Sequence, residues 1–321
     1  MYLKTTLIFA WFVVSYYSLV FAAEGWWQVA GAGLSLGLAV GAIGFNVQHD
    51  GAHGGYSGSK LVGRAMAFAL DVIGGSSYFW RWKHNVLHHT YPNIAGPDDD
   101  IDVGVLARLA PQQPRYGLHR FQHLYMWPLY GLVTVKWQIV DDFKDLIKGK
   151  VGTRVVPRPK GGELGLFVAG KLMFFTLAFG IPLLEHPWWA VLAGYAGISF
   201  MMGIILGIVF QMAHCVEEAD FPAPSPDTLR MAAEWAVHQV HTTVDFARHN
   251  RLLTVYLGGL NYQIEHHLFP QICHLHYPKL APIVEDVCRR FGVRYRAHPS
   301  LWAALASHYR WLRVMGRPEP A

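Results

Sequence analysis

Four apolar stretches, each long enough to cross a bilayer as a helix, constrain this sequence more than any other feature. A helix needs about 20 apolar residues to span the hydrocarbon core of a membrane. The stretches cover residues 3–23, 26–47, 164–184 and 188–212. Only 15% of the residues are charged, against about 25% in soluble domains. The sequence therefore predicts an all-α integral membrane protein.

The four stretches form two hairpins, because only a few residues join the members of each pair. Glu24-Gly25 joins the first pair, and Glu185-His186-Pro187 joins the second. A pair of tryptophans begins the second helix of each hairpin, where interfacial aromatic residues concentrate. No linker or repeat divides the chain, so we expect residues 1–321 to form one domain. It would consist of four transmembrane helices, with the polar segments 48–163 and 213–321 as a helical cap.

The distribution of lysine and arginine predicts the orientation of the chain in the membrane. Of 27 such residues, 14 lie between Lys60 and Lys160 and 11 between Arg230 and Arg317, while the two hairpin turns have none. Positive charge concentrates in cytoplasmic segments of membrane proteins. We therefore expect the cap and both termini on the cytoplasmic side of a multi-pass protein, in the inner membrane if the source is bacterial.

Some apolar stretches have a second interpretation. Residues 3–23 carry Lys4 and small residues before the turn, as a cleaved signal peptide does, but cleavage would leave an odd number of spans. Residues 61–80 and 123–140 contain charged residues or proline, so we expect interfacial helices rather than spans. Lys171, inside the third span, is expected to snorkel or to face the helix bundle, without a functional role.

Histidine is the unusual residue of this chain, with 18 copies that gather in short clusters. His49-Asp50-Gly51-Ala52-His53 follows the second span and places two imidazoles on one face of a helix. His84-Asn85-Val86-Leu87-His88-His89 holds three imidazoles, and Gln263-Ile264-Glu265-His266-His267 holds two more. His214 follows the fourth span. Taken singly, each cluster is also compatible with incidental interfacial or packing histidines.

Together the clusters predict a metal centre with more than one ion. The histidines all belong to segments expected on the cytoplasmic side: His49, His53, His84, His88, His89, His214, His266 and His267. Eight nitrogen ligands are too many for one first-row metal and suit two ions with about four ligands each. Imidazole binds iron, copper, nickel and zinc alike. A structural zinc site would favour four ligands including cysteine, and the three cysteines form no CxxC pair.

Other polar residues near the clusters are candidates for supporting roles. Gln263, Asp50 and Glu265 lie inside the boxes and are predicted as further ligands or as partners that orient the ligand histidines. The acidic run from Asp98 to Asp102 is interpreted as a solvated loop, with hydrogen bonding to ligand histidines as the alternative. Surface or supporting roles are expected for the remaining candidates: His119, His123, His238, His241, His249, His274 and His276.

The boxes HDGAH, HNVLHH and GGLNYQIEHHLFP, in this order and between two hairpins, resemble those of the membrane fatty-acid desaturase family. The third box begins with glutamine, as in front-end and bacterial linoleoyl-CoA-type desaturases. The likeness extends from the first span to about Pro282, and the segment around His214 matches as well. Any single box would be weak support, whereas the combination is highly specific.

The resemblance implies a cytoplasmic non-haem di-iron site and an enzyme that uses dioxygen and delivered electrons to desaturate a fatty-acyl chain. The eight histidines would hold the two irons. Gln263 stands where many relatives have a histidine, and it would coordinate weakly, hold a water or orient the site. An unactivated C–H bond yields to no side-chain acid or base, so a redox cofactor must carry that step.

One departure from the family pattern concerns the electrons. Many front-end relatives carry a fused cytochrome b5 domain, but this sequence has no His-Pro-Gly-Gly haem segment and no room for one before the first span. The expected partners are a separate donor, either ferredoxin or cytochrome b5 with its reductase, and an acyl substrate on CoA, a carrier protein or a membrane lipid. No nucleic-acid partner is expected, because the positive charge forms no concentrated stripe.

Two other functions compete with desaturation. A fatty-acyl or alkyl hydroxylase or ketolase would use the same scaffold, although the glutamine-first third box favours a desaturase. A metal transporter would need ionisable residues inside its spans, and these spans contain almost none. The sequence leaves open the position of the double bond, the acyl carrier, the donor and the oligomeric state.

Overall fold

The longest helices of the chain are the four that the hydropathy pattern predicts. The computed structural model describes residues 1–228 and 230–318. Each of the four helices is long and apolar enough to cross a membrane. They cover Tyr2–Ala22, Trp26–His53, Gly162–Glu185 and Trp188–His214. The predicted all-α membrane fold with two hairpins of spans is therefore confirmed.

Three of the four spans contain short π-helical stretches, which often occur at functional sites. The π-helical stretch η2 directly precedes the first histidine box, so the box lies on the last turns of the same continuous helix. Gly54, with φ of 78°, then ends this helix in a left-handed conformation. The spans consist of α1 (Tyr2–Tyr17) with η1 (Ser18–Ala22); α2 (Trp26–Ala42), η2 (Ile43–Gln48) and α3 (His49–His53); α10 (Gly162–Phe175), η8 (Thr176–Gly180) and α11 (Pro182–Glu185); and α12 (Trp188–His214).

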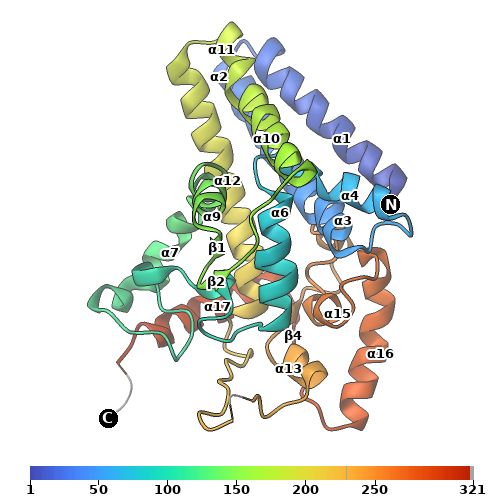
Figure 1. The fold of residues 1–321 in the computed structure, drawn as a ribbon, viewed down its shortest axis with the longest axis vertical. Helices are drawn as coiled ribbons and strands as arrows, with labels where there is room; N and C mark the ends of the chain where they lie inside the picture. Colours follow the sequence, from blue (N-terminus) through green and yellow to red (C-terminus); the bar gives the residue numbers. More distant parts are fainter. Residues whose placement is uncertain (229, 319–321) are drawn as a thin grey trace. The chain divides into compact units, whose positions relative to one another are not determined.

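The described chain clusters into two compact units. The first contains residues 1–80, 128–149 and 156–207, and the second contains residues 81–127, 150–155 and 208 onward. The first unit therefore holds the spans α1, α2 and α10 and most of α12 (Figure 1). Its shorter helices are α4 (Lys60–Ala67), α5 (Ala69–Val72), α6 (Ser77–Trp80), α8 (Val133–Lys136), η7 (Trp137–Asp141) and α9 (Asp142–Lys148).

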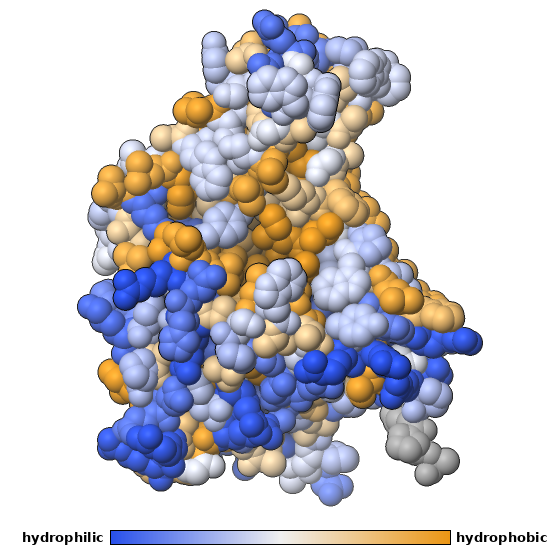
Figure 2. All heavy atoms as spheres, turned by 180° about the vertical axis from the view of Figure 1, so that it is seen from behind, coloured by the Kyte–Doolittle hydropathy of each residue, from blue (hydrophilic) through white to orange (hydrophobic). Residues whose placement is uncertain are grey.

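The surface of the spans is apolar, as expected for helices that face lipid. Leu7, Val14 and Leu172 expose 62%, 63% and 65% of their surface, and Figure 2 shows hydrophobic residues over the spans. Residues 61–80 and 123–140 form no helix that meets the length and hydropathy of a span within the described chain. They fold instead into short helices, of which α7 (Gln122–Tyr130) is the longest. Their interfacial position stays a prediction.

Lys171 faces the inside of the first unit and does not snorkel. Its ammonium donates to Asp142 Oδ2 at 2.6 Å and to the Gly74 carbonyl at 2.7 Å, and the residue is 5% exposed. A buried charge must be paired to be tolerated. The pair with Asp142 therefore joins α10 to α9 and leaves Lys171 no freedom to reach a water interface.

The second unit consists of short helices and loops with two small strand pairs. β1 (Lys150–Val151) pairs antiparallel with β2 (Arg154–Val155), and β3 (Asp245–Phe246) pairs parallel with β4 (Ala297–His298). The helical elements are η3 (Arg81–His88), η4 (Asp99–Ile101), η5 (Gly104–Leu106), η6 (Gly117–Phe121), α13 (Trp235–His241), α14 (Arg251–Tyr256), α15 (Gln263–Leu268), η9 (His274–His276), α16 (Tyr277–Arg290) and α17 (Leu301–Met315).

The core of the second unit positions the later histidine boxes. Val240, Ile264, Val284 and Cys288 form one buried cluster that packs α13, α15 and α16 together. Asn93 is fully buried, and its amide nitrogen lies 2.9 to 3.1 Å from the carbonyl oxygens of three distant residues: His214, Asp220 and Thr242. These contacts of the buried amide nitrogen fix the loop after the second box against the end of α12.

Candidate metal centre

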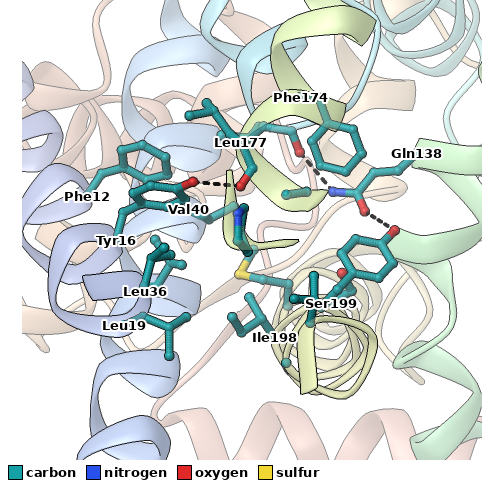
Figure 3. Close-up of a pocket in the computed structure, with 18 of the residues that line it drawn as sticks. Phe12, Tyr16, Leu19, Leu36, Val40, Gln138, Phe174, Leu177, Ile198 and Ser199 are labelled. Atoms are coloured by element: carbon teal, nitrogen blue, oxygen red, sulfur yellow. Dashed lines mark hydrogen bonds between the residues drawn. The ribbon is translucent and has the colours of Figure 1, made fainter. Parts of the chain in front are cut away.

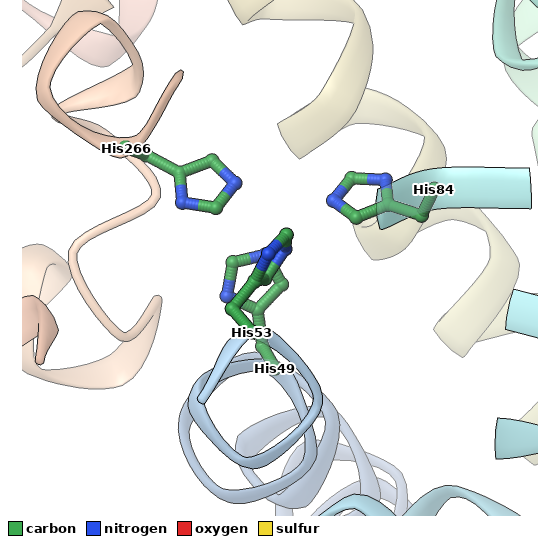
Figure 4. A group of neighbouring side chains, drawn as sticks. All are labelled: His49, His53, His84 and His266. Carbon is green, nitrogen blue, oxygen red and sulfur yellow. The ribbon is translucent and has the colours of Figure 1, made fainter. Parts of the chain in front are cut away.

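In the first unit, α3 presents the two histidines of the first box side by side. The ring centroids of His49 and His53 lie 4.7 Å apart. Both rings meet the edge of Trp80, at 5.8 and 5.5 Å between centroids. Figure 4 shows the two side chains leaving the same side of the helix. The i,i+4 spacing thus produces the shared face that the sequence predicts.

In the second unit, three buried histidines from three distant segments surround one point. His88 ends η3, His214 ends α12 and His267 lies on α15. Their ring centroids are 4.6 Å apart for His88 and His214, 5.0 Å for His88 and His267, and 4.9 Å for His214 and His267. Each has one nitrogen within 4.8 Å of those of the other two, which is the arrangement of a set of metal ligands.

A second group in the same unit shares His267 with the first. His89, His266 and His267 also bring nitrogen atoms within 4.8 Å of one another. His84 joins this group, because its Nε2 lies 3.3 Å from Nε2 of His89. The rings of His84 and His266 are nearly parallel at 6.1 Å (Figure 4). Two adjoining groups of imidazoles fit two metal ions better than one.

Four of these rings have their Nδ1 atoms next to a polar partner of the same unit. Nδ1 of His88 lies 3.1 Å from both oxygens of Asp98, and Nδ1 of His267 donates to Gln239 Oε1 at 2.9 Å. Weaker contacts of 3.4 Å join His84 to Asp100 and His266 to the Tyr277 hydroxyl. An outer partner on Nδ1 orients the ring and leaves Nε2 for a metal.

The carboxylates also set the charge around the second box. Burial lowers the pKa of His84. Burial also lowers the pKa of His88, but the charge of Asp98, its hydrogen bond and the charge of Asp100 together outweigh burial, so the pKa of His88 is raised. Burial raises the pKa of Asp100, yet Lys83 and the hydrogen bond from His84 bring the net shift downward. Asp100 therefore stays ionised and attracts a cation to the adjacent imidazoles.

Two ring nitrogens test whether a metal ion fits this site. Nε2 of His88 and Nδ1 of His214 are buried, and neither has a hydrogen-bond partner among the described residues. A buried polar atom left without a partner costs about 1–3 kcal/mol. A metal ion would accept the lone pair of each, and the all-nitrogen donor set suits a borderline transition metal such as iron.

Comparison with known proteins gives the family. A family model described as "Fatty acid desaturase" matches residues 24–299. The chain belongs to the fatty acid desaturase family. It is 42% identical to an sn-1 linoleoyl-lipid 6-desaturase of Arthrospira platensis, over 99% of this chain and 87% of that protein. A protein of the same name from Synechocystis sp. is 40% identical, over 99% and 89%.

A third relative extends the comparison. An acyl-lipid (8-3)-desaturase of Physcomitrium patens is 36% identical over 99% of this chain and 67% of that protein. These matches confirm the resemblance drawn from the histidine boxes. The protein is an enzyme that desaturates fatty-acyl chains, and this finding decides against the hydroxylase, ketolase and transporter alternatives.

The three supporting candidates of the desaturase lie in different surroundings. Gln263 contacts a predicted ligand, because its Nε2 lies 3.0 Å from Nε2 of His214. Glu265 is fully buried and accepts a hydrogen bond from the Tyr295 hydroxyl at 3.0 Å. Asp50 is buried, and its carbonyl accepts from the Gly55 amide at 2.9 Å. The ligand assignments themselves stay predictions.

The interpretation of the acidic run as a solvated loop was wrong for its first member. Asp98 is fully buried, holds Nδ1 of His88 and also accepts from the Asn93 amide at 2.9 Å. Asp100 is partly buried against His84. The available signal was the density of carboxylates ten residues after a histidine box in a chain with little charge.

Two more outer partners, Gln239 and Tyr277, were not predicted to contact a ligand ring. Each lies in a segment remote from the box whose histidine it contacts. The histidines set aside from ligation include His119 and His238. Nε2 of His119 lies 2.9 Å from the Val105 carbonyl and Nδ1 accepts from the Tyr116 amide, while His238 contacts the Pro92 carbonyl. These contacts assign both rings to loop packing.

Proposed function

We propose that this desaturase acts on a lipid-bound linoleoyl chain and introduces a double bond at position 6. Two relatives that share about two fifths of their residues with it over nearly the whole chain carry the name sn-1 linoleoyl-lipid 6-desaturase. The third is also an acyl-lipid desaturase by name. In this proposal, residues 1–321 form one membrane domain, and that domain performs the reaction with dioxygen as co-substrate.

The observation that carries the metal part of the proposal is the pair of adjoining imidazole groups with outer partners on Nδ1. Six of the eight predicted ligands belong to it, and the first box supplies the other two. The proposed ligands of two irons are His49, His53, His84, His88, His89, His214, His266 and His267. Iron supplies the oxidising chemistry that an unactivated C–H bond requires.

The residues of the chain have positioning roles in this proposal. Asp98 and Gln239 hold the proton on Nδ1 of His88 and His267, so that the opposite nitrogen of each ring can bind metal. Gln263 orients His214 through the contact between its amide and the ring. The electrons come from a separate ferredoxin, or cytochrome b5 with its reductase, on the cytoplasmic side where the positive-inside rule puts the cap.

The test is expression in a host whose lipids contain linoleoyl chains, together with a compatible electron donor. Fatty-acid methyl esters from each lipid class are analysed by mass spectrometry with location of the double bonds. We expect a triene with a new bond at position 6 in lipid-bound chains, and its absence with His88→Ala. His249→Ala, which removes an exposed histidine of the same unit, serves as the control and retains activity.

The other outcomes separate the parts of the proposal. A new bond at another position would overturn the regiochemistry and keep the metal site. Conversion of acyl-CoA before any lipid product would overturn the lipid-bound substrate. Two results would contradict the ligand set. One is purified wild-type protein that binds fewer than two metal ions per chain, and the other is a His88→Ala protein that binds as much metal as the wild type.

A further inference from the structure

An apolar cavity lies among the spans of the first unit. The cavity has a volume of about 220 Å³ and is lined by all four spans together with residues near α5, α8 and η7. Figure 3 shows Leu19, Leu36, Val40 and Ile198 around it. An apolar cavity of about 150 Å³ is already large enough to take up benzene. This cavity can therefore hold a hydrocarbon ligand.

The cavity is long and narrow. Its lining on α12 runs from Ala190 to Met202, which corresponds to about 18 Å of helix rise. On the first hairpin it runs along α1 and η1 from Phe12 to Val20. A volume of about 220 Å³ spread over this length fits one extended alkyl chain.

The polar side chains of the lining are mostly used by the protein itself. The Tyr16 hydroxyl donates to the Leu177 carbonyl at 2.8 Å. Gln138 donates to the Ile73 carbonyl at 2.8 Å and accepts from the Tyr195 hydroxyl at 2.9 Å (Figure 3). Apart from the small hydroxyl of Thr134, the wall thus offers mainly hydrocarbon surface. An occupant needs no polar group to bind here.

The surroundings determine which hydrocarbon is available. The cavity lies between helices that cross the apolar core of a bilayer, where lipid tails are the abundant small apolar groups. A void in protein forfeits the dispersion contacts of the atoms that line it. We infer that this cavity binds one alkyl chain, extended along the spans, which is the tail of a lipid molecule.

Two lipid molecules could supply that chain. The helix that contributes Val40 to the lining continues without a break to His49, nine residues and about 13 Å further on. The methyl-terminal part of the acyl substrate is therefore one source, and this alternative rests on the proposed function. A resident membrane lipid that stabilises the bundle is the other source.

Gly194 offers a way to fill the cavity. It lines the cavity, and a Cβ at this position would meet no atom within 4 Å. The Cβ of Gly194→Leu therefore meets no neighbour, and the rest of the leucine side chain should occupy part of the space. Gly197→Leu is the matched control, because Gly197 lies on the same helix, has equal room for a Cβ, is exposed and does not line the cavity.

The first measurement is photolabelling with phosphatidylcholine that carries a diazirine at the methyl end of one acyl chain. The protein is purified without an electron donor, so the result does not depend on turnover. We expect labelled peptides from residues 190–202 in the wild type and in Gly197→Leu, and loss of this label in Gly194→Leu. Labelling outside the lining, or equal labelling of all three proteins, would overturn the inference.

The second measurement identifies the source of the chain. With active enzyme, lipids whose acyl chains differ only in length at the methyl end compete for conversion. A shift toward shorter chains in Gly194→Leu, but not in Gly197→Leu, shows that the substrate tail occupies the cavity. Loss of label with an unchanged length preference shows a resident lipid. If Gly194→Leu does not fold, Gly194→Ala makes the same comparison with a smaller loss of volume.

Discussion

At the scale of single residues, the two nitrogens of an imidazole have separate tasks in the second unit. Nδ1 of His88 faces the Asp98 carboxylate, and Nδ1 of His267 faces the Gln239 amide oxygen. Both partners accept hydrogen bonds, so the neutral ring carries its proton on Nδ1. Nε2 of each ring then carries the lone pair that the proposed ligand role requires.

The first prediction concerns Asp98. Asp98→Asn keeps the size of the side chain but removes the charge that attracts a proton to Nδ1 of His88. We expect metal affinity or desaturase activity to fall about 10- to 100-fold, the usual cost of losing an outer partner. Metal analysis of the purified variant and product analysis of the same preparation measure the two effects.

Asp102→Asn is the matched control for this change. Asp102 belongs to the same acidic run, but it is exposed and accepts from the nearby Gly104 amide at 2.8 Å. It should retain wild-type metal content. Equal losses in the two variants would mean that the loop's total charge matters, and that Asp98 has no special role.

At the scale of secondary-structure elements, α15 is held in place from the side away from the ligand rings. Asp245 Oδ1 accepts from the Ile264 amide at 3.0 Å, in the first turn of the helix. The Tyr295 hydroxyl donates to Asp245 Oδ2 at 2.5 Å and to Glu265 at 3.0 Å. Burial raises the pKa of Asp245 to about 6. Burial and the nearby charge of Asp245 raise the pKa of Glu265 to about 9. At neutral pH the Tyr295 hydroxyl therefore stabilises the Asp245 carboxylate, which lies beside the protonated carboxyl of Glu265.

The second prediction is that Tyr295→Phe loosens α15. The change leaves the buried Asp245 carboxylate without its short hydrogen bond, and we expect a loss of about 2 kcal/mol in the free energy of unfolding. Thermal unfolding of the purified protein measures it. Tyr309→Phe removes a hydroxyl from a ring that packs on His123 and should unfold like the wild type. A Tyr295→Phe protein as stable as this control would show that the hydroxyl does not hold the helix.

The third prediction concerns the pH dependence of α17 docking. His308 is fully buried and donates from Nδ1 to the Cys215 carbonyl at 2.7 Å. Burial lowers the pKa of His308 to about 4, against about 6.5 in an unfolded chain. The unfolded state thus binds the proton first, and stability falls as the pH drops from about 6.5 toward about 4.

His308→Asn tests this dependence, because asparagine can keep a donor near the Cys215 carbonyl without titrating. The difference in stability between wild type and variant should change by about 3 kcal/mol across that pH window and stay constant above it. Hydrogen exchange of residues 301–315, measured at a series of pH values, reports the docking of α17. Parallel pH profiles for the two proteins would assign the acid sensitivity to another group.

At the scale of the whole molecule, the sequence predicts those features that depend on local pattern. Four spans follow from hydropathy, and the shared face of His49 and His53 follows from helical spacing. The partners of the ligand rings depend on contacts between remote segments, as with Gln239 and His267, which a single sequence does not encode locally. The interior position of Asp98 was missed because a run of carboxylates resembles a solvated loop until its folded neighbours are known.

The division of the chain into two units leads to the last prediction, which is the effect of metal removal. Six of the eight proposed ligands belong to the second unit, where they join η3, the end of α12 and α15. The spans of the first unit are stabilised by apolar packing and by the buried pair of Lys171 and Asp142. Metal that binds only the folded state adds stability to the elements it connects.

Chelation should therefore raise hydrogen exchange in residues 84–98, 238–245 and 263–277, while the middle of α1 and of α10 keeps its protection. The His88→Ala protein, which should hold less metal, is expected to exchange at the chelated level before any chelator is added. Mass spectrometry of peptides after timed exchange in detergent gives both comparisons. Exchange that rises equally in α1 and α10 would mean that the metal stabilises the whole chain as one cooperative body, and unchanged exchange in all three segments would argue against the proposed ligands.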